Sequence, residues 1–183
     1  MYTFDNFPIS NPLLKAITDL GFEKPTPIQA ESFNIIRAGK DVVGIAQTGT
    51  GKTLAFSLPL LKVLNPDSKE VQALILVPSR ELAIQIEQVI RSMGSGYKVN
   101  AVYGGRPMSK DKIEIKHNPA ILIGTPGRIL DHFDSDRFSK TSIKTLILDE
   151  FDKSLEDGFE EEMKGIITQL PSVNKRILTS ATQ

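Results

Sequence analysis

The sequence is organised around residues 41–53, which read Asp41-Val42-Val43-Gly44-Ile45-Ala46-Gln47-Thr48-Gly49-Thr50-Gly51-Lys52-Thr53. The apolar run at 41–46 predicts a buried strand, and the apolar stretch at 54–64 predicts a helix. A glycine-rich turn between a strand and a helix is the context that a phosphate-binding loop requires. The stretch therefore predicts a phosphate site, and the alternative is a plain glycine turn.

The residue types of this loop suit a phosphate for physical reasons. Gly49 and Gly51 permit backbone angles that other residues avoid, so main-chain N–H groups can approach an anion closely. The following helix directs its free N–H groups and the positive end of its dipole to the same point. Lys52 is expected to reach the β- and γ-phosphates, and the Thr53 hydroxyl is expected to bind Mg²⁺. Ala46 occupies the place of the usual first glycine.

The composition fits one globular domain. The 183 residues are enough for a single core and too few for two full domains. Lys plus Arg number 22, as do Asp plus Glu, so any contact with nucleic acid must be local. The absence of cysteine excludes disulfides, thiolate catalysis and zinc–cysteine sites. No apolar stretch approaches the roughly 18 residues of a membrane span, and residues 1–5 lack signal-peptide character. We therefore expect a soluble, cytoplasmic protein.

Strands and helices alternate through the rest of the chain. Further apolar strand candidates lie at 73–77, 99–103, 120–124, 144–149 and 176–180. Helix candidates lie at 13–20, 81–92, 110–116, 127–133 and 159–169. Short, nearly all-apolar strands separated by helices predict an α/β fold with a mostly parallel central sheet and helices on both faces. Ligands of such sheets bind beyond the carboxyl ends of the strands, where this chain places small, polar and charged residues.

The segment before the first strand combines a helix start with candidate base contacts. Thr26, Pro27 and Gln29 form a capping box with proline at the first helical position, which by itself explains Gln29. Alternatively, the Gln29 amide, which is both donor and acceptor, binds the edge of an adenine. Phe22 is either a core residue or a ring that stacks on the base.

Two adjacent acids follow the strand candidate at 144–149. Hydrolysis of a nucleoside triphosphate needs a carboxylate near Mg²⁺ and a group that orients the attacking water. Asp149 is a candidate for the metal and Glu150 for the base or water-positioning group. An acidic turn is the alternative for these two residues alone. Their place in the same sheet as Lys52 and Thr53 favours the catalytic interpretation.

Three other strand ends offer parts for binding phosphates. Ser79-Arg80, Gly104-Gly105-Arg106 and Thr125-Pro126-Gly127-Arg128 each combine a cap or glycine with an arginine. Helix N-termini and arginines bind phosphates, and three such sites along one edge suit a nucleic-acid backbone. Taken alone, each site is better explained as a surface arginine beside a cap. No aromatic residues interleave with them, so we expect backbone contacts that tolerate many sequences.

The two histidines carry no signal of their own. His117 and His132 lie in polar surroundings without the spacing of a metal or nucleophile motif. We therefore expect both at the surface.

Taken together, these residues resemble a known family. The set resembles the amino-terminal RecA-like domain of a DEAD-box ATP-dependent RNA helicase, and the resemblance covers essentially the whole chain in the family's order. The matching segments are Gln29, residues 46–53, Pro78-Ser79-Arg80-Glu81-Leu82, Gly104-Gly105, Thr125-Pro126-Gly127-Arg128, Asp149-Glu150-Phe151-Asp152 and Ser180-Ala181-Thr182. Ala46 in the phosphate loop is itself a habit of the family.

The resemblance implies a role for each matched residue. It implies nucleotide binding by Phe22, Lys24, Gln29, Ala46, Gln47, Thr48, Gly49, Thr50, Gly51, Lys52 and Thr53, with Phe4 as the upstream aromatic that supports the adenine site. It implies Mg²⁺ binding by Thr53 and Asp149, partly through water, and catalysis of ATP hydrolysis by Lys52, Asp149 and Glu150. It implies RNA contact by Pro78, Arg80, Gly104, Gly105, Arg106, Thr125, Pro126, Gly127 and Arg128. It implies coupling of the ATP state to the RNA state by Asp152, Ser180 and Thr182.

The chain departs from the family at two positions. Phe151 stands where the family has a small alanine, so its ring could shift Asp152 relative to Ser180 and Thr182. Ser79 replaces the usual threonine, which is a mild change.

The resemblance also sets expectations for the chain as a whole. Residues 1–183 are expected to form one helicase ATP-binding domain, with 1–30 as the adenine-recognition segment and without the family's second RecA-like domain. That domain carries arginine fingers, which are worth on the order of 10³–10⁵ in rate. We therefore expect a monomeric fragment that binds ATP weakly, hydrolyses little and does not unwind RNA. Alternatives are a non-catalytic, nucleotide-dependent RNA clamp or scaffold and a helicase directed at DNA.

Overall fold

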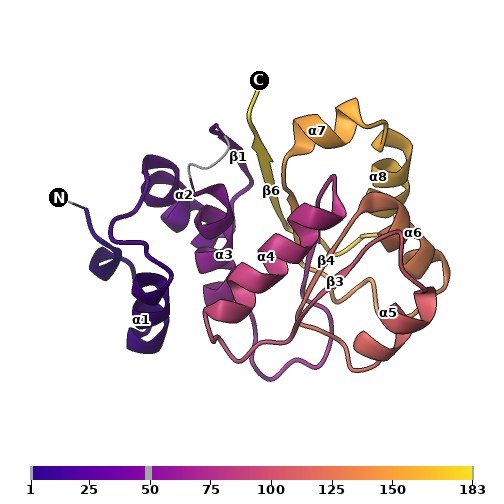
Figure 1. The fold of residues 1–183 in the computed structure, drawn as a ribbon, viewed down its shortest axis with the longest axis horizontal. Coiled ribbons are helices and arrows are strands. Elements are labelled where there is room, and N and C mark those ends of the chain that lie inside the picture. Colours follow the sequence, from indigo (N-terminus) through magenta and orange to yellow (C-terminus); the bar gives the residue numbers. More distant parts are fainter. Residues whose placement is uncertain (1, 48–50, 183) are drawn as a thin grey trace.

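The computed structural model describes residues 2–47 and 51–182. Within these residues the core is a six-stranded sheet in which every neighbouring pair of strands is parallel (Figure 1). The strands are β1 (Val42–Ile45), β2 (Ala73–Leu76), β3 (Val99–Val102), β4 (Ile121–Gly124), β5 (Thr145–Leu148) and β6 (Lys175–Ser180). Their order across the sheet is β1-β6-β5-β2-β4-β3. The predicted parallel sheet is therefore confirmed.

Helices connect the strands and precede the first of them. They are a short 3₁₀ helix η1 (Phe4–Asn6), α1 (Asn11–Asp19), α2 (Pro27–Arg37), α3 (Lys52–Val63), α4 (Arg80–Ser92), α5 (Met108–Glu114), α6 (Pro126–Asp134), α7 (Phe151–Glu156) and α8 (Glu160–Ile167). The predicted helices fall within a few residues of these bounds. The acidic segment after β5 was not predicted to be helical, although α7 begins at Phe151.

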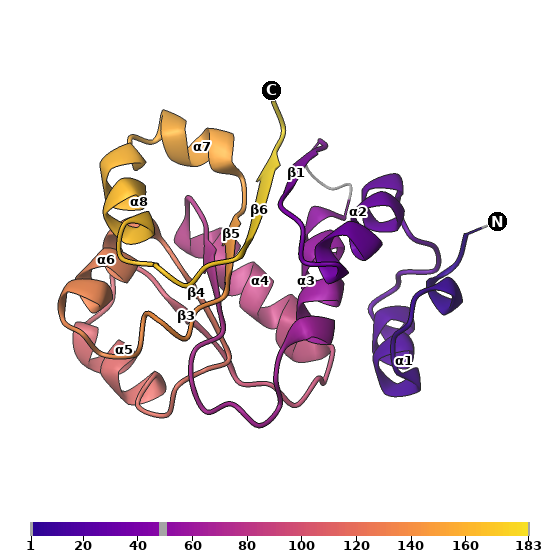
Figure 2. The same ribbon diagram turned by 180° about the vertical axis from the view of Figure 1, so that it is seen from behind.

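Two hydrophobic clusters pack on opposite faces of the sheet. Successive side chains of a strand point to opposite faces, so Ile75 of β2 belongs to one cluster and Leu74 to the other. The first cluster joins the sheet to α1, α2, α3 and α4, and the second joins it to α6 and α8. Figures 1 and 2 show α4 in front of the sheet in one view and behind it in the other. The sheet is thus covered on both faces, as predicted.

No helix among residues 2–47 and 51–182 is both long enough and apolar enough to cross a lipid bilayer.

Candidate functional site

The predicted site residues gather beyond the carboxyl ends of the strands, in two neighbouring groups. β1, β6 and β5 are adjacent, and the segments that follow them carry the candidate nucleotide and coupling residues. β2, β4 and β3 are adjacent, and the segments that follow them carry the candidate RNA residues. Because β5 pairs with β2, the two groups meet at the carboxyl ends of these two central strands.

The described part of the phosphate loop has the geometry that its sequence predicts. Gly51 caps α3 with a φ of 82°, in the left-handed region that favours glycine. A Cβ at this position would lie 2.3 Å from Gln29 Nε2, so a side chain here would also displace the Gln29 amide. Lys52 is 7% exposed, and its Nζ has no hydrogen-bond partner within residues 2–47 and 51–182. Thr48, Gly49 and Thr50 lie outside the described residues.

The unpartnered ammonium of Lys52 indicates a site for an anion. A buried cation without a partner is costly, and a phosphate would supply the missing acceptors. The free N–H groups at the start of α3 favour the same ligand, because helix N-termini attract anions. The loop also contacts the neighbouring strand, since Ala46 N–H donates to the Ser180 carbonyl at 3.0 Å.

Gln29 connects the start of α2 to the phosphate loop. Its Oε1 accepts from Thr26 N–H at 3.0 Å, as the capping box predicts, and its Nε2 donates to the Gly51 carbonyl at 3.1 Å. Gln29 is 1% exposed, so its amide is held firmly in this position. Phe22 packs on the core and lines the cleft described below, whereas Lys24 is exposed. Phe4 is buried and packs against Phe7 with ring centroids 5.8 Å apart. Any support that Phe4 gives to the adenine site therefore comes from within the core.

Asp149 and Glu150 are held by a residue that the sequence did not single out. Thr179 of β6 accepts a hydrogen bond from Glu150 N–H at 3.1 Å and donates one to the Asp149 carboxylate. Glu150 has a φ of 51°, a left-handed conformation that costs a residue other than glycine about 1–3 kcal/mol. Burial raises the pKa of Asp149 above its ordinary value, opposed by the Thr179 hydroxyl and the charge of Lys52. The sequence feature that could have identified Thr179 is a polar residue inside an otherwise apolar strand candidate.

One cleft brings the predicted catalytic residues together. It has a volume of about 300 Å³, and its lining includes Lys52, Thr53, Asp149 and Glu150, with Phe22 at the same wall. Further lining residues, which the sequence did not assign to the nucleotide, come from α4 and are Leu82, Gln85 and Val89. A charged end and an apolar wall suit a ligand with phosphates and a ring.

The oxygen donors of the cleft fit Mg²⁺. The Thr53 hydroxyl and the Asp149 carboxylate line the same space, and Mg²⁺ prefers oxygen ligands. Among the described residues, no group of three or more His, Cys, Asp or Glu side chains could hold a metal alone. Mg²⁺ is usually bound by one or two carboxylates together with substrate phosphates, which is the arrangement that this cleft allows.

Asp152 contacts the segment that follows β6. Its Oδ2 accepts from Thr182 Oγ1 and from Ala181 N–H, each at 3.2 Å. Burial acts to raise the pKa of Asp152, but the hydrogen bonds that it accepts outweigh this, and the pKa lies below its ordinary value. Phe151 is partly buried and packs against the cluster that joins the sheet to α6 and α8. The ring therefore does not separate Asp152 from Thr182, which remain hydrogen-bonded.

The candidate RNA arginines differ in how free they are. Arg80 is exposed and pairs with its neighbour Glu81 at 3.0 Å. Arg106 is bound through Nε to Asp111 at 2.7 Å and through Nη2 to Glu114 at 2.8 Å. Arg128 donates from Nη2 to the Arg106 carbonyl at 2.6 Å. The side chains of Arg106 and Arg128 are 16% and 10% exposed, and their contacts hold the segments after β3 and β4 together.

The remaining candidate RNA residues lie in the same segments after β2, β3 and β4. Gly105 has a φ of 84° and lies beside Arg80, since a Cβ on Gly105 would be 3.3 Å from Nη1. Pro78 and Pro126 are buried, and Thr125 stands at the N-cap position of α6. Gly104 and Gly127 have open space around them, which leaves room for a ligand to approach the main chain.

The predicted surface position of His132 is wrong. Its side chain is 0% exposed, and Nε2 lies 2.9 Å from Oδ2 of Asp111, which is also 0% exposed. Burial lowers the pKa of His132, and the hydrogen bond to Asp111 only partly opposes this. His132 therefore belongs to the buried network that holds Arg106 and Arg128. His117 is exposed, as predicted.

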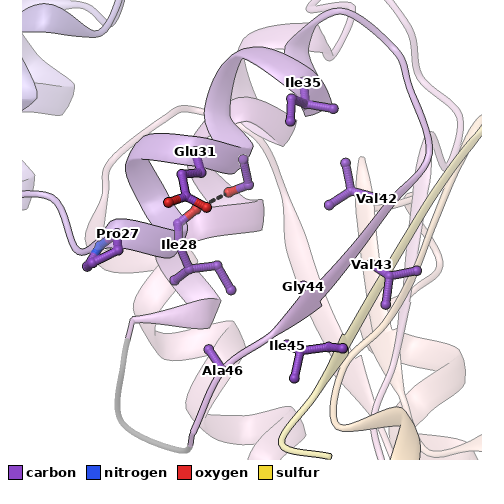
Figure 3. Close-up of a pocket in the computed structure, with 10 residues that line it drawn as sticks. Pro27, Ile28, Glu31, Ile35, Val42, Val43, Gly44, Ile45 and Ala46 are labelled. Atoms are coloured by element: carbon purple, nitrogen blue, oxygen red, sulfur yellow. Dashed lines mark hydrogen bonds between the residues drawn. The ribbon is translucent and has the colours of Figure 1, made fainter. Parts of the chain in front are cut away.

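A second hollow lies along the free edge of β1 and shares no lining residue with the cleft. It has a volume of about 360 Å³ and is lined mostly by apolar residues of α2 and β1, among them Ile28, Ile35 and Val42 (Figure 3). Among the described residues its lining includes no lysine or arginine. The hollow therefore lacks the charge that a phosphate needs.

The fold and the cleft define the class of protein as a parallel α/β domain that carries a phosphate-binding loop and an acidic pair. Comparison with known proteins then identifies the family. The family described as "DEAD/DEAH box helicase" matches residues 26–183. The chain belongs to this family and corresponds to the amino-terminal RecA-like domain of a DEAD-box RNA helicase.

Individual relatives agree. The chain is 42% identical over 182 residues to the DEAD-box ATP-dependent RNA helicase CshA of Bacillus subtilis, which covers 98% of this chain and 37% of that protein. It is 43% identical over 183 residues to the ATP-dependent RNA helicase DeaD of Escherichia coli, covering 98% of this chain and 29% of DeaD. The chain thus spans about a third of the length of these relatives.

Solved structures have the same fold. A DEAD box protein from the hyperthermophile Methanococcus jannaschii superposes with a TM-score of 0.93 at 35% identity, over 100% of this chain and 51% of that chain. A hypothetical ATP-dependent RNA helicase from Sulfolobus tokodaii gives a TM-score of 0.86 at 32% identity, over 95% of this chain and 51% of that chain. Both likenesses extend the family assignment from sequence to structure.

Proposed function

We propose that this chain is the ATP-binding and RNA-binding half of an ATP-dependent RNA helicase, which couples ATP hydrolysis to RNA unwinding or to remodelling of RNA–protein complexes. The observation that carries the proposal is the single cleft that contains Lys52, Thr53, Asp149 and Glu150. Residues 1–183 form one helicase ATP-binding domain in this proposal, and a second RecA-like domain of the same protein completes the enzyme.

Each cleft residue has its own role in hydrolysis. The Lys52 ammonium binds the β- and γ-phosphates, and its lack of a protein partner supports this role. Thr53 and Asp149 hold Mg²⁺, partly through water. Bound Mg²⁺ neutralises charge on the phosphate oxygens. Glu150 orients and activates the attacking water, and its place in the lining of the same cleft supports this assignment.

The segment before β1 recognises the base. Gln29 binds the edge of adenine while it caps α2, since its amide still has one donor hydrogen and one acceptor lone pair beyond its hydrogen bonds to Thr26 and Gly51. Phe22 stacks on the ring from the wall of the cleft, and Lys24 contributes from the exposed rim. Residues 1–30 are thereby the adenine-recognition segment.

The loops after β2, β3 and β4 bind the RNA backbone. Arg80 supplies an exposed guanidinium, and the N–H groups around Gly104, Gly105 and Gly127 supply main-chain donors. Such contacts position a strand without reading its bases. Binding is therefore tolerant of sequence. Stimulation of ATP hydrolysis by RNA and by DNA of one sequence tests the preference, because only RNA presents a 2′-hydroxyl.

The isolated domain binds nucleotide weakly and turns over little. Arginine fingers from a second RecA-like domain are worth on the order of 10³–10⁵ in rate. Robust RNA-stimulated turnover by residues 1–183 alone contradicts this part of the proposal.

The test is Glu150→Gln in the complete helicase. We expect loss of RNA-stimulated ATP hydrolysis with the dissociation constant for ATP unchanged, because the charge of the base is lost and the shape of the cleft is kept. Glu156→Gln, an exposed change on the same helix, is the control. Turnover that survives Glu150→Gln overturns the catalytic assignment. A complete protein that binds ATP and RNA without any turnover supports the alternative of a non-catalytic clamp.

A further inference from the structure

We propose that Thr179 positions the acidic pair for turnover, because one hydroxyl group holds both the Asp149 carboxylate and the backbone of Glu150. The proposal rests on the proposed function, since it concerns how the same cleft is kept in order. Thr179 touches neither nucleotide nor metal in this scheme, so it is a positioning residue.

The Thr179 hydroxyl has capacity for both contacts and no easy substitute. A hydroxyl offers one hydrogen and two lone pairs. The hydrogen goes to Asp149, and a lone pair accepts the Glu150 N–H at 3.1 Å. Thr179 is 3% exposed and Asp149 is also 3% exposed. Water therefore has little access to replace either bond, and removal of the hydroxyl leaves both partners unsatisfied.

The backbone of Glu150 needs such support. Its φ of 51° and ψ of 50° are unfavourable for a glutamate, and strained conformations persist only where the surroundings hold them. The N–H that donates to Thr179 belongs to this residue. A change that frees the N–H allows Glu150 to relax, which moves its carboxylate away from the position that the cleft gives it.

The place of Thr179 in the sheet adds a second consequence. β6 lies between β1 and β5 (Figure 2). The next residue, Ser180, accepts through its carbonyl from Ala46 N–H at the start of the phosphate loop. The end of β6 therefore touches the phosphate loop on one side and the acids on the other. A shift of the segment 180–182 reaches Asp149 and Glu150 through the side chain of Thr179.

The experiment compares three variants of the complete helicase. Thr179→Val removes the hydroxyl and keeps the shape, and Thr179→Ser keeps the hydroxyl. Thr145→Val is the matched control, because Thr145 is a buried strand threonine at the opposite end of the neighbouring strand β5. We expect Thr179→Val to lower kcat by about 10–100-fold, the usual effect of losing a group that orients a metal-binding carboxylate. We expect the KM for ATP to stay within about twofold, and Thr179→Ser and Thr145→Val to stay near wild type.

A second measurement does not depend on turnover. The affinity for a fluorescent ADP analogue is measured at rising Mg²⁺ concentrations. We expect Thr179→Val to require about tenfold more Mg²⁺ for the same gain in affinity, and Thr179→Ser to match wild type. Thr179→Ala is measured in parallel, so that a second hydroxyl-free variant is present if valine prevents folding.

Two results overturn the proposal. One is a folded Thr179→Val or Thr179→Ala protein whose kcat and Mg²⁺ requirement equal those of wild type. The other is an equal loss in Thr179→Ser, because the hydroxyl is then not the cause. Failure of the proposed function is recognised separately, by turnover that survives Glu150→Gln. In that event the Mg²⁺ titration alone supports or overturns the role of Thr179.

Discussion

Asp152 and Thr182 form a hydrogen bond, 3.2 Å between Oδ2 and Oγ1, that joins the first turn of α7 to the end of β6. The Ala181 N–H reaches the same carboxylate oxygen at 3.2 Å. Asp152 follows the acidic pair within two or three residues, and Thr182 follows the strand that contacts the phosphate loop. This contact is therefore a physical connection between the nucleotide cleft and the segment that is expected to couple it to RNA.

Thr182→Val is predicted to uncouple the complete helicase. It removes the hydroxyl donor and leaves Asp152 with the Ala181 N–H. A hydrogen bond to a charged group is worth roughly 1.5–3 kcal/mol when protected, and this exposed one less, so we expect unwinding to fall by about tenfold. The dissociation constant for ATP should remain within about twofold, because the phosphate contacts lie elsewhere. Duplex unwinding and nucleotide titration measure the two effects.

Thr141→Val, an exposed change in the loop before β5, is the control for that experiment. Unwinding at the wild-type rate in Thr182→Val, with Thr141→Val also unchanged, contradicts a coupling role for the contact.

Lys52→Met is predicted to stabilise the nucleotide-free protein while it abolishes nucleotide binding. The Lys52 ammonium is buried and unpartnered among the described residues, and methionine fills similar space without a charge. We expect the free energy of unfolding to rise by roughly 1–3 kcal/mol, the usual cost of an unsatisfied buried polar group. Thermal unfolding without nucleotide and titration with ATP measure the two effects.

Lys62→Met at the other end of α3 is the matched control, because Lys62 is exposed. An unchanged ATP dissociation constant in Lys52→Met rules out the loop assignment. If the melting temperature of nucleotide-free Lys52→Met is lower than that of wild type, the premise that Lys52 is a buried charge without a partner is wrong.

The sequence predicted most of the fold because strand signals were strong and local. Short apolar runs bounded by glycine, proline and polar residues located every strand of the described sheet, and a parallel sheet then fixed one edge for the ligands. The helix α7 was missed because an acidic strand end gave no helical period. Its start depends on the left-handed conformation of Glu150, which the partner strand supports.

The contacts between distant segments could not be predicted in the same way. Thr179 and Asp149 are 30 residues apart, and only the order of the strands brings them together. Phe151 led us to expect a displaced Asp152, but its ring packs against the cluster that joins the sheet to α6 and α8. The sequence did not single out Asp111, because it lies among other polar residues of its helix. It is nevertheless the buried carboxylate that binds Arg106, Arg128 and His132.

Arg80→Ala and Arg106→Ala are predicted to weaken RNA binding for different reasons. Arg80 is exposed and its ion pair with Glu81 lies at the surface, so its loss should lower RNA affinity and reduce the salt slope by about 1 with little change in stability. Arg106 is bound to buried Asp111, so its loss leaves that carboxylate short of a partner. We expect the free energy of unfolding to fall by roughly 2–4 kcal/mol. RNA titrations at several salt concentrations and chemical denaturation separate the two. Equal stability of both variants contradicts the distinction.

His132 is predicted to make stability depend on pH below neutrality. Burial lowers its pKa in the folded protein, with the charges of Arg137 and Arg128 acting in the same direction and Asp111 acting against them. The unfolded chain then binds the proton more readily, since an unperturbed histidine has a pKa of about 6.5. Stability is therefore retained above about pH 6.5 and is lost as the pH falls from there toward the folded pKa.

The pH experiment isolates this residue by substitution. Chemical denaturation at several values between about pH 5 and pH 8 should give a steeper loss of unfolding free energy in wild type than in His132→Gln. His117→Gln, an exposed change, should follow wild type, which removes the effects of other groups that titrate in this range. A wild-type slope equal to that of His132→Gln contradicts a lowered pKa of His132 in the folded protein, because equal slopes mean that folding does not change the proton uptake of this residue.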